Sequence, residues 1–163
     1  MKKIFFALAL LSISVVFAQA QDTSLVLEEG VNPHKGIDRI YREFSESYRT
    51  LDYKKVANLY TEDVAYLSPS RNIVFGRDVV SENFEDFFRR VKESERSMTI
   101  SFRILKRSVS ADFGYDVGVF ELKYSKEGKI VTEAKGKFVV VNARGKDGTW
   151  RFAVDAYSDL DSD

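Results

Sequence analysis

The chain has 163 residues, of which 44% are hydrophobic and 13% aromatic, and its 25 basic residues are balanced by 25 acidic ones. This length and apolar content suffice for one compact domain with a sizeable buried core. A balanced charge provides no general positive field, so we expect no nucleic-acid partner. The sequence contains no cysteine, which excludes disulfides, thiolate metal sites and a cysteine nucleophile.

Residues 1–20 have the pattern of a secretory signal peptide. Lys2 and Lys3 precede an apolar run over residues 4–17, and Ala18-Gln19-Ala20 forms a small-residue cleavage site. The apolar run is shorter than the roughly 20 residues that span a bilayer, and no stop-transfer segment follows it. We therefore predict cleavage before Gln21 and export to the periplasm or the extracellular space, without a stable membrane anchor.

Residues 21–35 show no sustained periodicity, so we interpret them as a flexible leader that precedes the domain. They contain the only histidine, His34, which we expect to be a solvated loop residue. A single histidine offers little material for a His-rich metal site or a Ser-His-Asp triad. We therefore predict no metal and no cofactor.

Three helices are predicted next. Apolar residues recur at three- and four-residue steps from Ile37 to Leu51, which indicates an amphipathic helix. Asp52 is a suitable N-cap for a second, shorter helix, whose apolar positions extend to Tyr60. After Gly76, residues 79–91 predict a third helix with a strongly aromatic inner face.

Strands make up the rest of the chain. Two short ones are predicted at residues 64–67 and 72–75, before the third helix. From Met98 to Ile104 apolar and polar residues alternate, which indicates a strand with one buried face. The basic residues near this strand are interleaved with acidic ones and predict a solvated surface. Long β-rich segments follow at 111–124 and 130–144.

The clearest hairpin lies in residues 136–159, where two β-rich runs flank a turn at residues 145–148. Strict alternation then sorts the last strand into two faces, one with Trp150, Phe152, Val154 and Ala156 and the other with Arg151, Ala153, Asp155 and Tyr157. Helices followed by long antiparallel strands predict a single α+β domain over residues 36–159, with the helices on one face of a curved sheet. Residues 160–163 form an acidic tail.

Six short pieces of sequence carry a resemblance to a known family: residues 51–64, 73–78, 112–118, 136–138 and 147–151, and Asp155. In this order and spacing, residues 37–159 resemble the nuclear transport factor 2-like (NTF2-like), or SnoaL-like, superfamily, which includes ketosteroid isomerase. The resemblance implies a cone-shaped antiparallel sheet with three N-terminal helices packed on its concave side. It also implies a ligand pocket at the wide end and homodimers formed through the outer sheet face.

The resemblance does not extend to the chemistry of ketosteroid isomerase. That enzyme uses a general-base carboxylate and an oxyanion hole made of a tyrosine and a protonated aspartic acid. When the sequences are aligned at Asp52, the tyrosine position is Phe44, the base position is Ser68 and the aspartic acid position is Gly136. None of these residues can perform the corresponding role, so we expect no isomerase activity by that mechanism.

Two carboxylates are the candidate catalytic groups, and each has a structural alternative. Asp116 could face solvent on the outer side of its strand. Asp155 could form an ion pair with Arg151 on the same strand face. The residues that we expect to contact a ligand are Tyr41, Phe44, Tyr60, Tyr66, Phe84, Phe88, Asn142, Trp150 and Tyr157. Each tyrosine could instead be a core residue whose hydroxyl finds a partner.

The leading functional hypothesis is an exported, cofactor-free domain that binds a small, largely apolar molecule in its cone and works as a homodimer. The first alternative is an isomerase, dehydratase or hydrolase that uses the same pocket. It requires an inward carboxylate with a raised pKa beside a tyrosine. The second alternative is a structural association module that uses only the outer sheet face.

Overall fold

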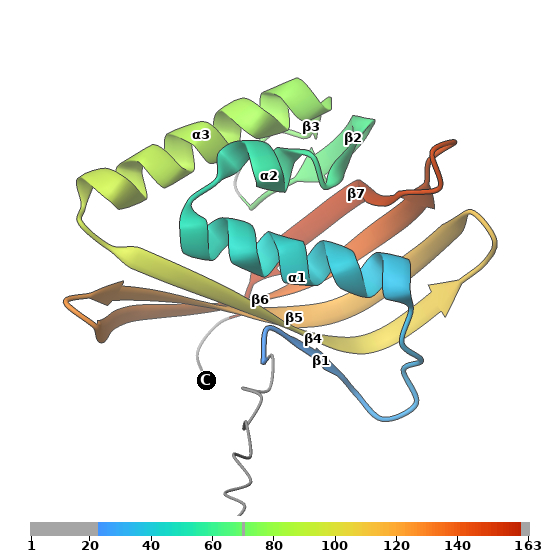
Figure 1. Ribbon diagram of the computed structural model, residues 1–163, viewed down its shortest axis with the longest axis horizontal. Helices are drawn as coiled ribbons and strands as arrows, with labels where there is room; N and C mark the ends of the chain where they lie inside the picture. The colour runs from blue at the N-terminus through green and yellow to red at the C-terminus, as the bar shows by residue number, and fades with distance from the viewer. Residues whose placement is uncertain (1–22, 70, 161–163) are drawn as a thin grey trace, which may run out of the picture.

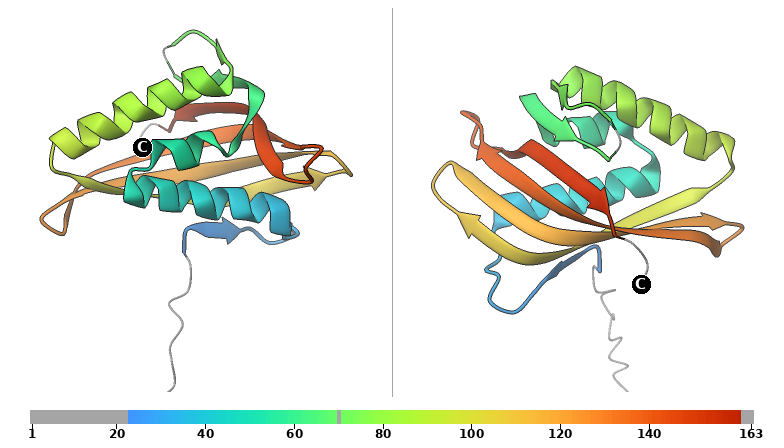
Figure 2. Two further views of the ribbon diagram at one scale, coloured as in Figure 1. Left: turned by 45° about the horizontal axis from the view of Figure 1, so that its top comes forward. Right: turned by 180° about the vertical axis from the view of Figure 1, so that it is seen from behind.

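The computed structural model describes residues 23–69 and 71–160. Within them, a seven-stranded curved sheet has the strand order β1-β4-β5-β6-β7-β2-β3, and helices α1, α2 and α3 cover one of its faces (Figure 1). The elements are β1 (Leu25–Leu27), α1 (Lys35–Thr50), α2 (Tyr53–Ala57), β2 (Tyr60–Leu67), β3 (Val74–Phe75), α3 (Arg77–Glu93), β4 (Ser97–Val109), β5 (Phe113–Lys126), β6 (Lys129–Arg144) and β7 (Trp150–Asp159). The predicted α+β architecture is confirmed (Figure 2).

The ends of the chain are only partly covered by the described residues. The predicted signal peptide lies outside them, as do the last three residues of the predicted acidic tail. The leader contains more structure than we expected, because β1 pairs in parallel with β4 at the sheet edge and its two leucines, Leu25 and Leu27, pack against the core. None of the helices within the described residues is long and apolar enough to cross a membrane.

Helix α1 begins at a histidine cap. The Nδ1 atom of His34 accepts a hydrogen bond from the Ile37 backbone N–H at 3.1 Å, and its ring lies edge-on to Trp150 with the ring centroids 4.9 Å apart. The expectation of a solvated histidine was therefore wrong, because the ring both caps the helix and packs on the sheet. The cap of α2 is the predicted one, since the Asp52 side chain accepts from the Lys55 N–H at 2.9 Å.

The second helix is shorter than predicted. Helix α2 ends at Ala57, and Tyr60 already belongs to strand β2, which pairs in parallel with β7. The turn between β6 and β7 has the predicted composition, and Gly148 adopts the left-handed φ of 75° that favours glycine. The long antiparallel strands β4 to β7 form the centre of the sheet.

A β-bulge interrupts the alternation of β7. Val141 on β6 pairs with Val154, but the next residue, Asn142, pairs with Phe152, so Ala153 is one extra residue on the bulged strand. Asp155 is consequently buried, on the same side as Phe152. The predicted strict alternation was therefore wrong beyond Phe152, because the bulge shifts the inward positions of β7 by one residue.

Strand β4 contains a corresponding bulge. Ile104 pairs with Gly118 and Lys106 pairs with Val117, which leaves Leu105 as the extra residue. The alternation predicted from Met98 to Ile104 is confirmed before this point, because its apolar residues are buried. After it, Arg107 turns inward, and its side chain is only 3% exposed.

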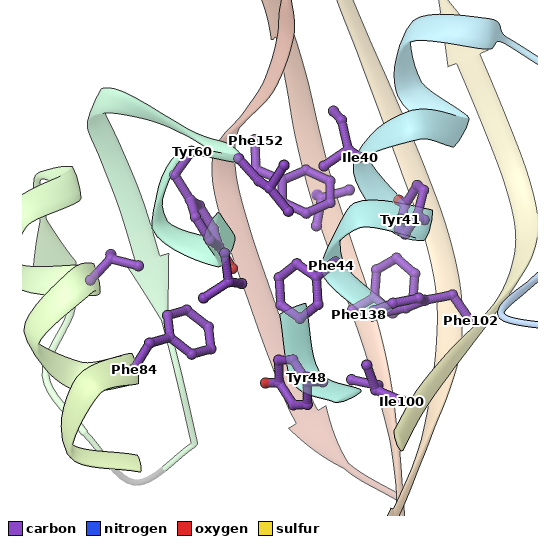
Figure 3. Packing of buried hydrophobic residues seen from close by; sticks show 14 of the residues in the cluster. Ile40, Tyr41, Phe44, Tyr48, Tyr60, Phe84, Ile100, Phe102, Phe138 and Phe152 are labelled. Atoms are coloured by element: carbon purple, nitrogen blue, oxygen red, sulfur yellow. The ribbon is translucent and has the colours of Figure 1, made fainter. Parts of the chain in front are cut away.

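The core lies between the helices and the concave sheet face, and it is mainly aromatic. Phe44 of α1 is at its centre in Figure 3, where side chains from the sheet and from α3 surround it. Its ring centroid lies 5.5 Å from that of Phe102, 6.0 Å from that of Phe84 and 6.2 Å from that of Phe152. Such edge-to-face and tilted contacts are the favoured geometries of aromatic pairs.

Candidate functional site

A cavity of about 310 Å³ lies between the concave sheet face and helices α1 and α3. This volume is at the lower end of the roughly 300–1,000 Å³ of ligand pockets. The apolar wall includes Phe44, Phe84, Phe102, Phe120, Phe138 and Phe152. Four of the lining residues are exposed, and we call the part of the cavity that they line the mouth: Arg71, Arg90, Ala134 and Asp159.

Asp155 is the buried carboxyl group in the cavity wall. Only 8% of the residue is exposed, and its Oδ2 accepts a hydrogen bond from the Tyr60 hydroxyl at 2.7 Å. Burial raises the pKa of Asp155 to about 6, and the hydrogen bond from Tyr60 opposes this effect only in part. A carboxyl group that titrates close to neutral pH, inside a cavity, can act as a general acid or base.

Two further tyrosines place their hydroxyls near this carboxyl group. The hydroxyls of Tyr66 and Tyr157 are 3.4 Å apart, and both residues line the cavity. Burial and the charge of Asp155 raise the pKa of Tyr66, while burial raises the pKa of Tyr157. Both groups are therefore protonated at neutral pH and can donate hydrogen bonds to a ligand.

Asp116, the other candidate, belongs to a buried ion-pair network and does not line the cavity. Arg107 donates to both of its carboxylate oxygens, at 2.7 and 3.0 Å, and the Tyr41 hydroxyl donates to Oδ2 at 2.8 Å. Arg107 also donates to Asp38 at 2.5 Å. The carboxylate of Asp116 is thus fully engaged, and the expected alternative of a solvated surface group was wrong, because the residue is completely buried.

The ion pair proposed for Asp155 is also absent from the described residues. Arg151 instead pairs with Asp147 of the hairpin turn at 2.8 Å. The hydrogen bond from Arg151 lowers the pKa of Asp147. The bulge at Ala153 separates the two side chains that strict alternation had placed on one face.

The structure divides the predicted ligand contacts into two groups. Five of them line the cavity: Tyr41, Phe44, Tyr66, Phe84 and Tyr157. Four do not: Tyr60, Phe88, Asn142 and Trp150. Tyr60 still reaches the site indirectly, through its hydrogen bond to Asp155. Trp150 packs on His34 at the start of α1, and Asn142 is fully buried beside Asp116, so both belong to the core.

Sequence reasoning did not identify several of the residues that line the cavity. Asn83, Phe87 and Arg90 all line the cavity from α3. Their spacing of four and three residues places them on one helix face, and this is the signal that could have identified them. Arg71 lies in the segment between β2 and β3, where the sequence carries no comparable pattern.

The three positions that correspond to the ketosteroid isomerase groups are now placed. Phe44 and Ser68 line the cavity. A Cβ atom on Gly136 would overlap the ring of Phe120 and would lie 2.8 Å from the Ser158 carbonyl oxygen. An aspartic acid at position 136 would therefore require Phe120 to move. The described residues also contain no group of three or more acidic or histidine side chains that could hold a metal ion.

Comparison with known proteins identifies the fold. No protein-family model matches this chain, and no curated protein matches it in sequence. A ketosteroid isomerase-like protein from Erwinia carotovora atroseptica superposes with a TM-score of 0.62 at 18% identity, over 78% of this chain and 96% of that one. An NTF2-like protein from Novosphingobium aromaticivorans gives 0.66 at 14% identity, over 79% and 82%.

A third solved structure extends the comparison to a protein with a named activity. A candidate dehydratase of the NTF2-like family from Streptomyces avermitilis superposes with a TM-score of 0.60 at 16% identity, over 78% of this chain and 96% of that one. The chain therefore has the NTF2-like fold. At these identities the similarity establishes the fold only, because one fold supports many functions.

Proposed function

We propose that this protein binds a small, largely apolar molecule in the cavity between its helices and its sheet. The observation that carries the proposal is the combination of a 310 Å³ cavity, an aromatic wall and a few inward polar groups. Ligand sites typically combine a concave apolar surface with a small number of polar groups that fix the orientation of the ligand.

Binding can be tested with 4-phenyl-1-butanol, a small apolar alcohol, in an NMR titration of the purified protein. We expect saturable shifts of cavity residues such as Tyr66 and Phe84. The Ala134→Phe variant adds a ring at the mouth and should weaken binding at least tenfold. Glu133→Phe is the matched control, because Glu133 is the adjacent exposed residue on β6 and does not line the cavity. Equal binding by both variants would contradict the proposal.

A second candidate function is proton-transfer catalysis in the same cavity, and Asp155 is the observation that favours it. Above a pH of about 6 the ionised carboxylate can remove a proton from a carbon next to a carbonyl group. The Tyr66 or Tyr157 hydroxyl can then donate a hydrogen bond to the enolate oxygen that forms. This arrangement uses none of the three positions at which ketosteroid isomerase carries its groups.

The exchange of α-protons of 4-phenylbutan-2-one in D₂O, followed by NMR, tests this second function. The wild-type rate should rise with pH through about 6 and then level off, because only the ionised form of Asp155 accepts a proton. Asp155→Asn should reduce exchange to the buffer rate, whereas Asp112→Asn, an exposed change in the turn between β4 and β5, should not. Exchange that is unaffected by Asp155→Asn would rule out this role.

We also propose that the outer sheet face forms a homodimer. Val117 and Val139 are cross-strand partners on this face, and they are 36% and 44% exposed. Apolar pairs of this kind favour association when a second copy covers them. Sedimentation of wild type and Val139→Asp tests the proposal: wild type should be a dimer and the variant a monomer, and a wild-type monomer would contradict it.

Export remains a proposal that rests on the sequence of residues 1–20. Its test is the intact mass of the protein recovered from a secretion-competent bacterial host. A mature chain that begins at Gln21 would support export, and a full-length chain retained in the cytoplasm would contradict it.

A further inference from the structure

Two arginines at the mouth of the cavity have no hydrogen-bond or ion-pair partner within the described residues, although the charge of Arg90 adds to the larger effect of Arg89 in lowering the pKa of Asp86 on the same helix. Arg71 and Arg90 line the cavity and are exposed, and neither guanidinium group forms a hydrogen bond or an ion pair in that part of the chain. Neighbouring arginines differ in this respect. Arg89 pairs with Asp86 at 2.9 Å, and Arg77 donates to the Tyr60 carbonyl oxygen at 2.9 Å.

The two arginines reach the mouth from different elements. Arg90 is on the face of α3 that carries Asn83 and Phe87, both of which line the cavity. Arg71 follows β2, and its charge lowers the pKa of Tyr157 on β7, against the larger effect of burial. The positive charge of Arg71 therefore acts on a residue of β7, the strand that pairs with β2.

The inner end of the cavity, unlike the positively charged mouth, is apolar and contains an acidic group. Its aromatic wall offers an anion no compensation for lost hydration, and Asp155 would repel an anion when it is ionised. An anionic group is therefore disfavoured inside and favoured at the mouth. Asp159 also lines the mouth, but it forms no ion pair with Arg71 or Arg90 within the described residues.

We propose that the ligand of this cavity is an amphipathic acid, whose apolar body lies against the aromatic wall and whose single carboxylate binds Arg71 and Arg90 at the mouth. This inference rests on the proposed function, because it assumes that the cavity binds a ligand. Guanidinium groups suit this role, since their paired N–H donors match the two oxygens of a carboxylate.

The test compares two probes of nearly the same size, 4-phenylbutanoate and 4-phenyl-1-butanol, in NMR titrations at neutral pH and low salt. Wild type should bind the carboxylate about tenfold more tightly than the alcohol, as expected for charge-assisted hydrogen bonds at a partly exposed site. The double variant Arg71→Gln/Arg90→Gln should lose this preference and bind the alcohol as wild type does. Added salt should weaken the binding of the carboxylate only.

Arg89→Gln is the matched control, because Arg89 is the adjacent exposed arginine on α3 and does not line the cavity. It should leave both affinities unchanged. Asp159→Asn should strengthen binding of the carboxylate by about twofold and leave the alcohol unchanged, because it removes a like charge from the mouth.

The outcomes separate this inference from the proposed function. If the alcohol binds and the carboxylate binds no more tightly, the amphipathic acid is ruled out while the apolar cavity stands. The same holds if the double variant keeps the preference for the carboxylate. If neither probe binds to wild type, both proposals fail.

Discussion

Asp116 and Asp155, the two candidate carboxylates of the sequence, are both buried but have different hydrogen-bond partners and different positions relative to the cavity. Asp116 accepts hydrogen bonds from Arg107 and Tyr41, and it does not line the cavity. Asp155 has a single described donor, Tyr60, and lies in the cavity wall. A buried carboxylate with a full set of partners supports the fold. A buried carboxylate with few partners still has free acceptor positions for hydrogen bonds from a ligand.

The first prediction concerns Arg107, the basic partner that Asp116 has and Asp155 lacks among the described residues. Arg107→Ala leaves two buried carboxylates, Asp38 and Asp116, without their cation, and should lower the free energy of unfolding by about 3–5 kcal/mol. Urea unfolding provides the measurement. The control is Arg103→Ala on the same strand, where the ion pair with Glu28 is exposed and should contribute at most about 1 kcal/mol. Similar losses from both changes would contradict the structural role assigned to Arg107.

The second prediction concerns the cost of keeping Asp155 buried. The pKa of Asp155 is about 6 in the folded protein, above the usual value of about 3.9 for an unfolded chain. Between these two pH values the folded state binds more protons, so stability falls as the pH rises through this window. Asp155→Asn should therefore stabilise the protein by about 1–3 kcal/mol at neutral pH.

This stability difference should shrink as the pH falls towards about 4 and disappear below about 3, where Asp155 is protonated in both the folded and unfolded states. Urea unfolding at several pH values measures it, and the exposed Asp112→Asn serves as the control. A loss of stability at neutral pH would show that the carboxylate of Asp155 is structural, like that of Asp116.

The third prediction has the smallest expected effect and concerns the hydrogen bond that Asp155 accepts from Tyr60, its only side-chain donor among the described residues. Tyr60→Phe removes the donor that opposes the effect of burial, so the pKa of Asp155 should rise further, by about one. Carbon-13 NMR of the side-chain carboxyl group measures this change. The control Tyr53→Phe alters a tyrosine outside the cavity and should have no effect on Asp155. An unchanged or lowered pKa in Tyr60→Phe would contradict the assigned hydrogen bond.

The sequence could predict the parts of this structure that depend on regular periods. The heptad-like spacing from Ile37 to Tyr48 identifies the buried face of α1, and Asp52 identifies the cap of α2. Alternation also identifies the inward residues of β4 up to Ile104. These patterns are local, because each residue's face is fixed by its position in a regular element.

The different roles of the two candidate carboxylates could not be predicted in the same way, because two β-bulges determine which side chains lie beside them. The extra residues of the bulges are Leu105 and Ala153, and they turn Arg107 and Asp155 inward. Neither of the extra residues is a glycine or another residue typical of a bulge. Pairing with the neighbouring strand decides where the extra residue is placed, so periodicity within one strand does not reveal it. The roles of Asp116 and Asp155 therefore became distinguishable only in three dimensions.

The most direct test of this account is the titration of Asp155 in the presence and absence of 4-phenyl-1-butanol, followed by carbon-13 NMR of its carboxyl group. We expect a pKa of about 6 for Asp155 in the free protein. With the alcohol bound we expect a higher pKa, because an apolar ligand displaces water from the carboxyl group. A pKa close to the ordinary value of about 4, unaffected by the alcohol, would contradict the assignment of Asp155 to a ligand-binding cavity.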